Sequence, residues 1–177
     1  MFGRIKKLDN SIIEGISKIH KPAITKIMIT ASMSCNLGII WWLFCLPFLL
    51  RAEWRRTGFN IIFGIAIAHI MGELIIKHIV KRSRPCHRLD DDELLIARPR
   101  FYSFPSGHSM SSFAVVGVTL LRCQLITFLP ILLIASLIAF SRLYLRVHYL
   151  TDVLAGVLLG FTCGVSSVLI FNAFIPM

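Results

Sequence analysis

The chain has few acidic side chains and few charged side chains of either sign. Only 9 of its 177 residues are Asp or Glu, against 19 Lys and Arg, so the formal net charge is +10. The basic residues do not form a stripe along a polar segment, as a nucleic-acid-binding surface would require, and we expect no nucleic-acid partner. With 56% hydrophobic residues and a mean hydropathy of +0.76, the excess charge instead indicates contact with anionic lipid or an anionic substrate.

The sequence also lacks the patterns by which cysteines bind metals or form disulfide frameworks. Its five cysteines are scattered, without a CxxC pair or a Cys/His ligand spacing. Four of them lie in or beside apolar segments, so we interpret them as small hydrophobic side chains. The basic N-terminus is not followed by a compact apolar run and a small-residue cleavage site, so no cleavable signal peptide is expected.

Long apolar runs dominate the chain and are typical of integral membrane proteins. We expect an all-α membrane helical bundle that forms a single domain over residues 1–177. Residues 1–22 should form an amphipathic helix in the membrane interface, because apolar residues recur there at helical spacing. About five transmembrane helices are expected, at residues 22–50, 59–80, 106–121, 125–145 and 151–175. Small residues at every fourth position of the last span predict close helix packing: Gly156, Gly160 and Gly164.

The most informative stretch is Ser141–Asp152, which reads SRLYLRVHYLTD between two apolar segments. Charged side chains in such a place are costly unless they have a function. His148 and Asp152 are four residues apart, so on a helix they would share one face and could hydrogen-bond. A carboxylate on one imidazole nitrogen leaves the other nitrogen free to act as a nucleophile, and Arg142 is a planar fork suited to phosphate. A buried ion pair that only joins two helices is the alternative.

Two further polar clusters are expected at the same end of the bundle. In one, Lys77 is followed seven residues later by Arg84 and a proline, although basic residues at a helix end often simply reach toward lipid headgroups. The other is PSGH at 105–108, where a capping serine and a helix N-terminus could bind an anion. Five spans would bring all three clusters to one membrane face, which predicts a single phosphate-binding site.

The order K-x6-RP, PSGH and SR-x5-H-x3-D resembles the type 2 phosphatidic acid phosphatase superfamily, which also includes vanadium-dependent haloperoxidases and acid phosphatases. All three signatures are complete, and the resemblance covers the catalytic segment 77–152. The apolar helices favour the membrane branch of the family over its soluble branches. The resemblance implies a phosphatase that uses no metal and no cofactor and hydrolyses a lipid phosphate or diphosphate through a phosphohistidine.

Carried onto this sequence, the resemblance assigns His148 as the nucleophile, Asp152 as its orienting partner and His108 as the general acid that protonates the leaving oxygen. The phosphate oxygens would be bound by five residues: Lys77, Arg84, Ser106, Gly107 and Arg142. Fixed cations and a helix N-terminus suit the negative charge that spreads over these oxygens during phosphoryl transfer. Because one histidine must be neutral and the other protonated, we predict a bell-shaped pH–rate profile.

Three residues outside the motifs are possible supporting members of the site. Glu73 lies one helical turn before Lys77 and could steer it toward the phosphate, or the two could form a buried pair without catalytic effect. Arg100 and Arg146 could bind a second phosphate of a diphosphate, or be ordinary interfacial arginines. The acidic run at 90–93 is typical of solvated carboxylates, and we assign no metal to it.

The resemblance extends to the short bacterial members that hydrolyse undecaprenyl diphosphate, which is the expected substrate. Phosphatidylglycerophosphate and phosphatidate are the nearest alternatives. A non-catalytic anionic-lipid binder or transporter is a more distant one. The motifs contact the phosphate and carry no signal about the lipid tail or the oligomeric state.

Membrane orientation gives two conflicting signals. All basic residues except Arg51, Arg55, Arg56 and Arg122 fall on the site face, and this count alone would place the site in the cytoplasm. Bacterial membrane members of the family place the site on the extracytoplasmic face of the cell membrane. We expect that orientation.

Overall fold

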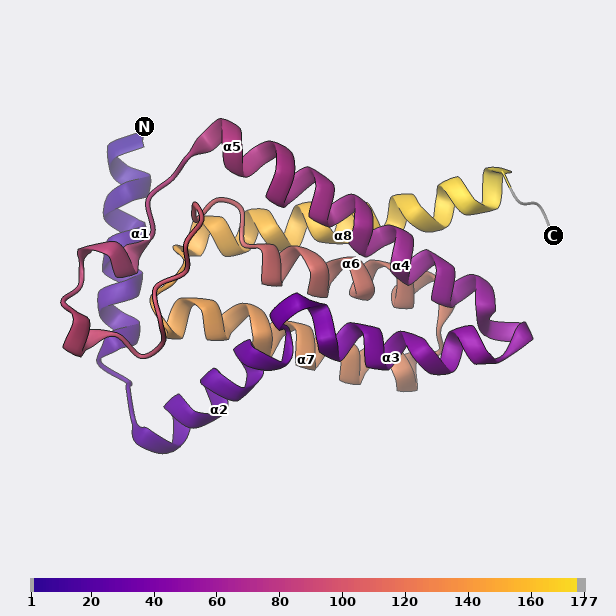
Figure 1. The fold of residues 1–177 in the computed structure, drawn as a ribbon, viewed down its shortest axis with the longest axis horizontal. Helices are drawn as coiled ribbons and strands as arrows, with labels where there is room; N and C mark the ends of the chain where they lie inside the picture. The colour runs from indigo at the N-terminus through magenta and orange to yellow at the C-terminus, as the bar shows by residue number, and fades with distance from the viewer. Residues whose placement is uncertain (1, 175–177) are drawn as a thin grey trace.

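The computed structural model describes residues 2–174, and the regular structure within that range is helical throughout (Figure 1). The predicted all-α class is therefore confirmed. The principal α-helices are α1 (Phe2–Ser17), α2 (Pro22–Ser34), α3 (Ile39–Leu50), α4 (Arg55–His69), α5 (Lys77–Val80), α6 (Gly107–Arg122), α7 (Leu125–Tyr144) and α8 (Leu150–Phe174). A π-helical segment, Ile70–Ile76, joins α4 to α5, and short 3-10 turns lie at Asn36–Gly38, Ala52–Trp54, Pro85–Arg88 and Asp91–Glu93.

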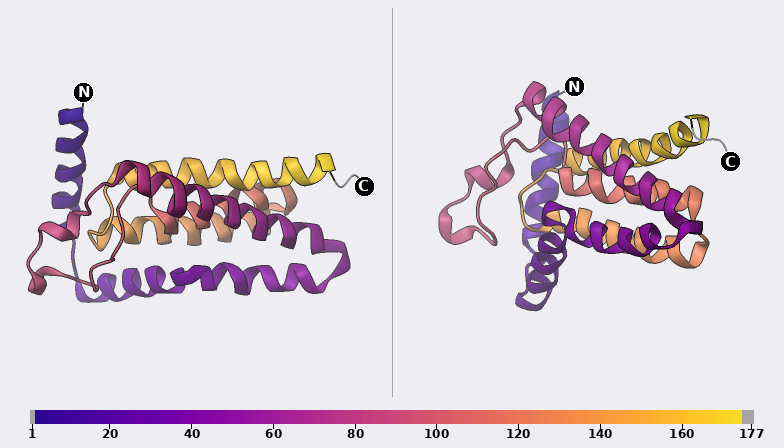
Figure 2. Two further views of the ribbon diagram at one scale, coloured as in Figure 1. Left: turned by 45° about the horizontal axis from the view of Figure 1, so that its top comes forward. Right: turned by 45° about the vertical axis from the view of Figure 1, so that its right-hand side comes forward.

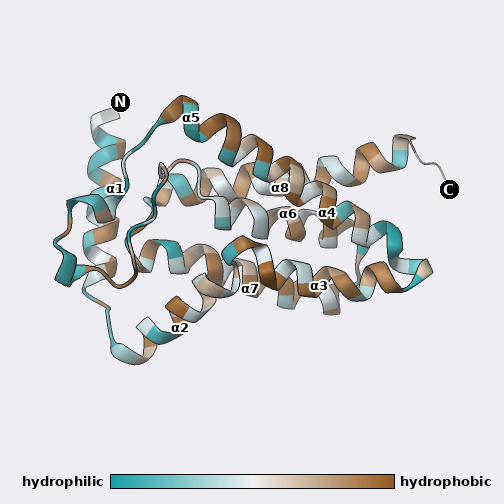
Figure 3. Ribbon diagram, viewed as in Figure 1, coloured by the Kyte–Doolittle hydropathy of each residue, from teal (hydrophilic) through white to brown (hydrophobic). Residues whose placement is uncertain are grey.

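The long helices run side by side, and α1 crosses one end of their bundle (Figures 1 and 2). Helix α6 lies at the centre, where it packs against α4, α7 and α8. Figure 3 shows polar residues concentrated on α1 and on the loop between α5 and α6 at that same end, with apolar residues along the bundle. The amphipathic N-terminal helix is present, and it also packs into the bundle through Ile13, which is buried against Leu143 and Val153.

Three of the described helical segments are long and apolar enough to cross a membrane: Ala52–Arg88, Leu125–Tyr144 and Leu150–Phe174. The expected first span is broken into α2 and α3, which are bent by 57° and would give up to four spans if counted as one. The break occurs where Leu37 and Gly38 adopt positive φ values of 52° and 71°, which a helix cannot accommodate. The expected third span is α6, whose 16 residues are fewer than the roughly 20 that usually cross a bilayer.

Helices α6 and α8 form the closest contact in the bundle, through the predicted glycine stripe of α8. A Cβ atom on Gly160 would lie 2.2 Å from the carbonyl oxygen of Met110, and one on Gly164 would lie 2.1 Å from that of Ala114. Only glycine leaves room for backbones this close. The predicted close packing is confirmed, and it fixes where α6 begins relative to α8.

We predict that Gly160→Ala destabilises the protein by about 1–3 kcal/mol, because the added methyl group meets the backbone of α6 and the helices must separate. Thermal unfolding in detergent should show a lower midpoint. Gly15→Ala is the matched control, since a Cβ at that exposed position of α1 meets nothing within 4 Å. Equal midpoints for Gly160→Ala and the wild type would contradict the packing argument.

Candidate active site

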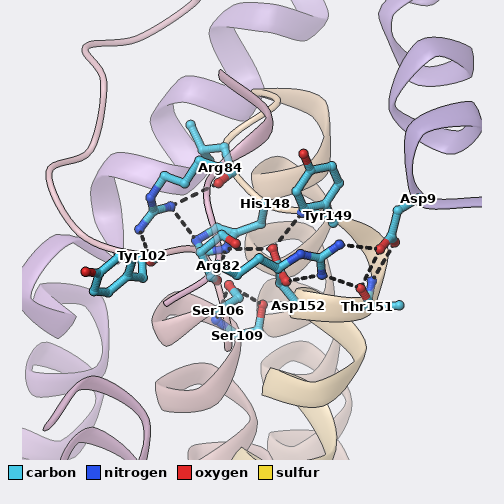
Figure 4. Close-up of polar contacts among 12 residues, drawn as sticks. Asp9, Arg82, Arg84, Tyr102, Ser106, Ser109, His148, Tyr149, Thr151 and Asp152 are labelled. Atoms are coloured by element: carbon cyan, nitrogen blue, oxygen red, sulfur yellow. Dashed lines mark hydrogen bonds and ion pairs between the residues drawn. The ribbon is translucent and has the colours of Figure 1, made fainter. Parts of the chain in front are cut away.

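The three polar clusters meet at the end of the bundle that α1 crosses (Figure 4). The end of the first cluster touches the third, because the guanidinium of Arg84 lies 3.0 Å from the ring of His148. The second cluster is joined to the third through the backbone, where the N–H of Ser106 donates to the carbonyl of Asp152 at 3.0 Å. Segments distant in the sequence therefore form one site, as expected.

His148 lies in the turn between α7 and α8 and is only 2% exposed. Its Nδ1 is 2.7 Å from the carbonyl oxygen of Ser103, which can only accept a hydrogen bond, so Nδ1 carries the proton. Nε2 is then left with its lone pair, and it accepts a hydrogen bond from Nη1 of Arg84 at 3.0 Å. The imidazole is thus held in the tautomer whose unprotonated nitrogen, Nε2, faces the guanidinium of Arg84.

The predicted hydrogen bond between His148 and Asp152 is wrong. Oδ2 of Asp152 is 3.7 Å from Nδ1 of the imidazole and accepts instead from the backbone N–H of Tyr149 at 2.9 Å. The prediction placed both residues on one helix, but α8 begins at Leu150, after the histidine. Asp152 stands beside the ring as a counter-charge, while Ser103 takes the proton.

Lys77 is buried, and its Nζ donates to both carboxylate oxygens of Glu73 at 2.6 and 2.7 Å. The pair predicted from their spacing is therefore formed. Glu73 lies in the π-helical segment before α5, where an extra residue per turn rotates the following side chains around the axis. Its carboxylate also packs against Gly107, since a Cβ at that glycine would lie 2.1 Å from Oε1.

Arg84 and Arg142 are buried, at 4% and 5% exposure, and within residues 2–174 neither forms an ion pair with a carboxylate. Arg142 donates to the hydroxyl of Ser32, and its Nε is buried without a hydrogen-bond partner in the described chain. Arg84 donates to the backbone carbonyls of Phe101, Tyr102 and Val147. Burying two cations without a directly paired carboxylate is unfavourable, and an anion bound beside them would offset that cost.

The PSGH segment begins α6 as predicted. Ser106 is the N-cap residue, and its Oγ accepts hydrogen bonds from the Ser109 hydroxyl at 2.9 Å and the Ser109 N–H at 3.5 Å. His108 lies in the first turn, where its Nε2 donates to Oδ1 of Asn36 at 3.2 Å. Gly107 is the first helical residue, so its N–H is one of those that an α-helix leaves without an internal partner.

Of the two possible supporting arginines, Arg146 is bound to Glu93 on the loop between α5 and α6. Arg146 donates to the backbone carbonyl of Glu93 at 2.6 Å, and its Nη1 is 3.7 Å from the Glu93 carboxylate. Arg100 is exposed on the loop between α5 and α6. The acidic run is not merely solvated, because Asp90 and Glu93 form a capping box and Asp91 pairs with Arg98 at 2.8 Å.

A cavity of about 450 Å³ opens beside the site between α3, α4 and α6. One end reaches Glu73, Gly107 and His108. Its remaining wall is mainly apolar and includes Leu37, Trp42, Ile62 and Ile65. The shape and polarity suit a hydrocarbon chain attached to a phosphate.

Three residues that motif reasoning missed complete the site: Ser103, Arg82 and Asp9. Ser103 acts through its backbone carbonyl, which every residue possesses, so no side-chain pattern could identify it. Arg82 lies inside the first motif at a position that the motif leaves free, and it donates to Asp152 at 2.6 Å. Asp9 is a buried acid of α1 that lies outside all three motifs, and it accepts a hydrogen bond from Arg82 at 2.7 Å.

Both the sequence and the fold are similar to those of known phosphatases. The chain is 31% identical over 112 residues to an undecaprenyl-diphosphatase of Sulfolobus acidocaldarius, covering 63% of this chain and 54%, about half, of that relative. It is 29% identical over 172 residues to phosphatidylglycerophosphatase B of Bacillus subtilis, covering 88% and 79%. The crystal structure of a transmembrane PAP2-type phosphatidylglycerolphosphate phosphatase from B. subtilis has the same fold, with a TM-score of 0.76 at 23% identity over 97% of this chain and 88% of that one.

A family model described as the PAP2 superfamily matches residues 57–176, which is more than half of the sequence and includes all three motifs. The chain therefore belongs to the PAP2 superfamily, the type 2 phosphatidic acid phosphatases.

Proposed function

We propose that the protein is a membrane phosphatase that hydrolyses a lipid phosphate or diphosphate through a phosphohistidine on His148. The observation that carries the proposal is the pair of buried guanidinium groups, Arg84 and Arg142, which lack a carboxylate partner among the described residues. They lie next to an imidazole whose Nε2 is unprotonated and faces Arg84. A phosphoryl group would supply the missing negative charge and place its phosphorus within reach of that nitrogen.

In the proposed reaction, Nε2 of His148 attacks the phosphorus while the bond from phosphorus to the leaving oxygen breaks. His108 donates a proton to that oxygen, so the lipid alcohol or lipid phosphate leaves with its departing oxygen protonated. Water then attacks the phosphohistidine, with His108 taking its proton, and inorganic phosphate is released. Lys77, Arg84 and Arg142 stabilise the charge on the phosphoryl oxygens throughout.

The rest of the site has supporting roles in this proposal. Ser106 holds the start of α6 in place, and the Gly107 N–H offers a hydrogen bond to a phosphoryl oxygen. The positive charge that develops on the attacking imidazole is stabilised by Asp152 at 3.7 Å and by the Ser103 carbonyl at 2.7 Å. We assign the whole unit to a single domain, residues 1–177, with the catalytic groups in 77–152.

The apolar cavity next to His108 supports a lipid as the leaving group, because the general acid must sit beside the leaving oxygen. Undecaprenyl diphosphate is the first candidate, in keeping with the similarity to an undecaprenyl-diphosphatase. Phosphatidylglycerophosphate is the second, since the match to phosphatidylglycerophosphatase B spans most of both chains. The extracytoplasmic orientation of the site stays a prediction.

We predict that the purified protein in detergent releases inorganic phosphate from undecaprenyl diphosphate, phosphatidylglycerophosphate or phosphatidate faster than from soluble p-nitrophenyl phosphate. His148→Ala should lower release by about a thousandfold or more, because the attacking nitrogen is lost. His87→Ala, at an exposed histidine of the neighbouring loop, should leave release unchanged. Lipid binding by the wild type without phosphate release would instead support the binder or transporter.

The pH dependence of kcat/KM tests which form of His148 attacks. Burial, followed by the charges of Arg84, Arg142 and Lys77, holds the pKa of His148 well below its usual value near 6.5. A lowered pKa keeps the imidazole neutral at neutral pH, so activity should fall only when the pH drops well below 6.5. An acid limb at pH 6.5 or above would contradict the assignment.

We predict that Glu73 orients Lys77, because its carboxylate binds the ammonium group with both oxygens beside Gly107. Glu73→Gln should lower kcat/KM by about tenfold, and Glu73→Ala by more, since the charge-assisted hydrogen bonds are weakened and then removed. Thermal unfolding of both variants provides the control for folding. Unchanged rates in both variants would assign the pair a purely structural role.

A further inference from the structure

Asp9 connects the N-terminal helix to the catalytic end of the bundle. Although most of α1 is exposed, Asp9 is only 1% exposed. Its Oδ1 accepts from the backbone N–H of Thr151 at 3.1 Å, and its Oδ2 accepts from the Thr151 hydroxyl at 2.6 Å and from Arg82 at 2.7 Å (Figure 4). The carboxylate is therefore bound to the first turn of α8, next to Asp152.

Arg82 bridges the two carboxylates. Its Nη2 donates to Asp9, while its Nη1 donates to Oδ1 of Asp152 at 2.6 Å and to the Thr151 hydroxyl at 2.6 Å. The guanidinium carbon also lies 4.1 Å from the centre of the Tyr149 ring. The guanidinium of Arg82 is bound by a carboxylate on each side and by the Tyr149 ring on its face, so it has little conformational freedom. Arg82 therefore holds the carboxylate of Asp152 in place.

The contacts continue from Asp152 to the histidine. One oxygen of Asp152 is taken by Arg82, and the other accepts from the Tyr149 N–H at 2.9 Å and lies 3.7 Å from Nδ1 of His148. Two carboxylates share one guanidinium, so the cluster keeps a net negative charge beside a ring that becomes positive when it attacks phosphorus. Without Asp9, Arg82 would neutralise Asp152 alone.

We propose that Asp9 and Arg82 are positioning residues, which hold the Asp152 carboxylate behind His148 and make its placement depend on helix α1. The inference rests on the proposed function, because it matters only if His148 is the nucleophile. Helix α1 is also held by the burial of Ile13 against α7 and α8. Asp9 can therefore be changed while α1 stays docked.

A double-mutant cycle tests the proposal. Asp9→Asn should lower kcat about tenfold with KM within about twofold of the wild type, because the chemical step is affected and phosphate binding is not. In an Asp152→Asn background the same change should have no further effect, since the carboxylate that Asp9 positions is no longer charged. Glu14→Gln, at an exposed carboxylate of the same helix, is the matched control and should leave kcat unchanged.

Arg82→Lys provides a second variant that does not alter α1. Lysine keeps the charge but cannot bind two carboxylates as a fork, so kcat should fall about as far as in Asp9→Asn. Equal fold-losses from Asp9→Asn in both backgrounds, or wild-type kcat in Arg82→Lys, would overturn the inference. The proposed function is judged separately, by phosphate release from the wild type and its loss in His148→Ala.

Discussion

The burial of positive charge at one end of the bundle is the constraint on which the structure depends. Arg84 and Arg142 lie inside the protein without a carboxylate partner in the described chain, a state that an apolar environment strongly disfavours. The backbone carbonyls around Arg84 compensate only part of that penalty, because they bring dipoles and no net charge. An anion bound beside the two guanidinium groups would offset this penalty, so their burial favours the phosphate of the proposed substrate.

The packing of the helices keeps Arg84 and Arg142 from moving out toward solvent. Gly160 and Gly164 bring α8 against α6 so closely that the start of α6 is fixed beside the turn carrying His148. On the other side, the π-helical segment places Glu73 against Gly107, where it binds Lys77. Close backbone packing thus determines the distances among groups that come from three different helices.

The sequence predicted the helices and the convergence of the motifs, because apolar periodicity and helix ends are local properties. It did not predict the break at Leu37, where the backbone turns left-handed, or the π-helical segment, whose residues suit an ordinary α-helix. The predicted hydrogen bond between His148 and Asp152 was wrong because it depended on whether α8 begins before or after the histidine. The hydrogen bond to Ser103 involves a backbone atom, and only tertiary structure brings that atom to the ring.

The role proposed for α1 changes what counts as the catalytic unit. The family model begins at residue 57, so Asp9 lies outside the segment that carries the motifs. Yet its carboxylate binds both Arg82 and the first turn of α8, and through Arg82 it reaches Asp152. A helix whose exposed surface includes Ile5 and Leu8 is suited to the membrane interface. The position of α1 and the charge beside His148, the proposed nucleophile, are therefore linked by a single guanidinium group, so α1 belongs to the proposed catalytic unit.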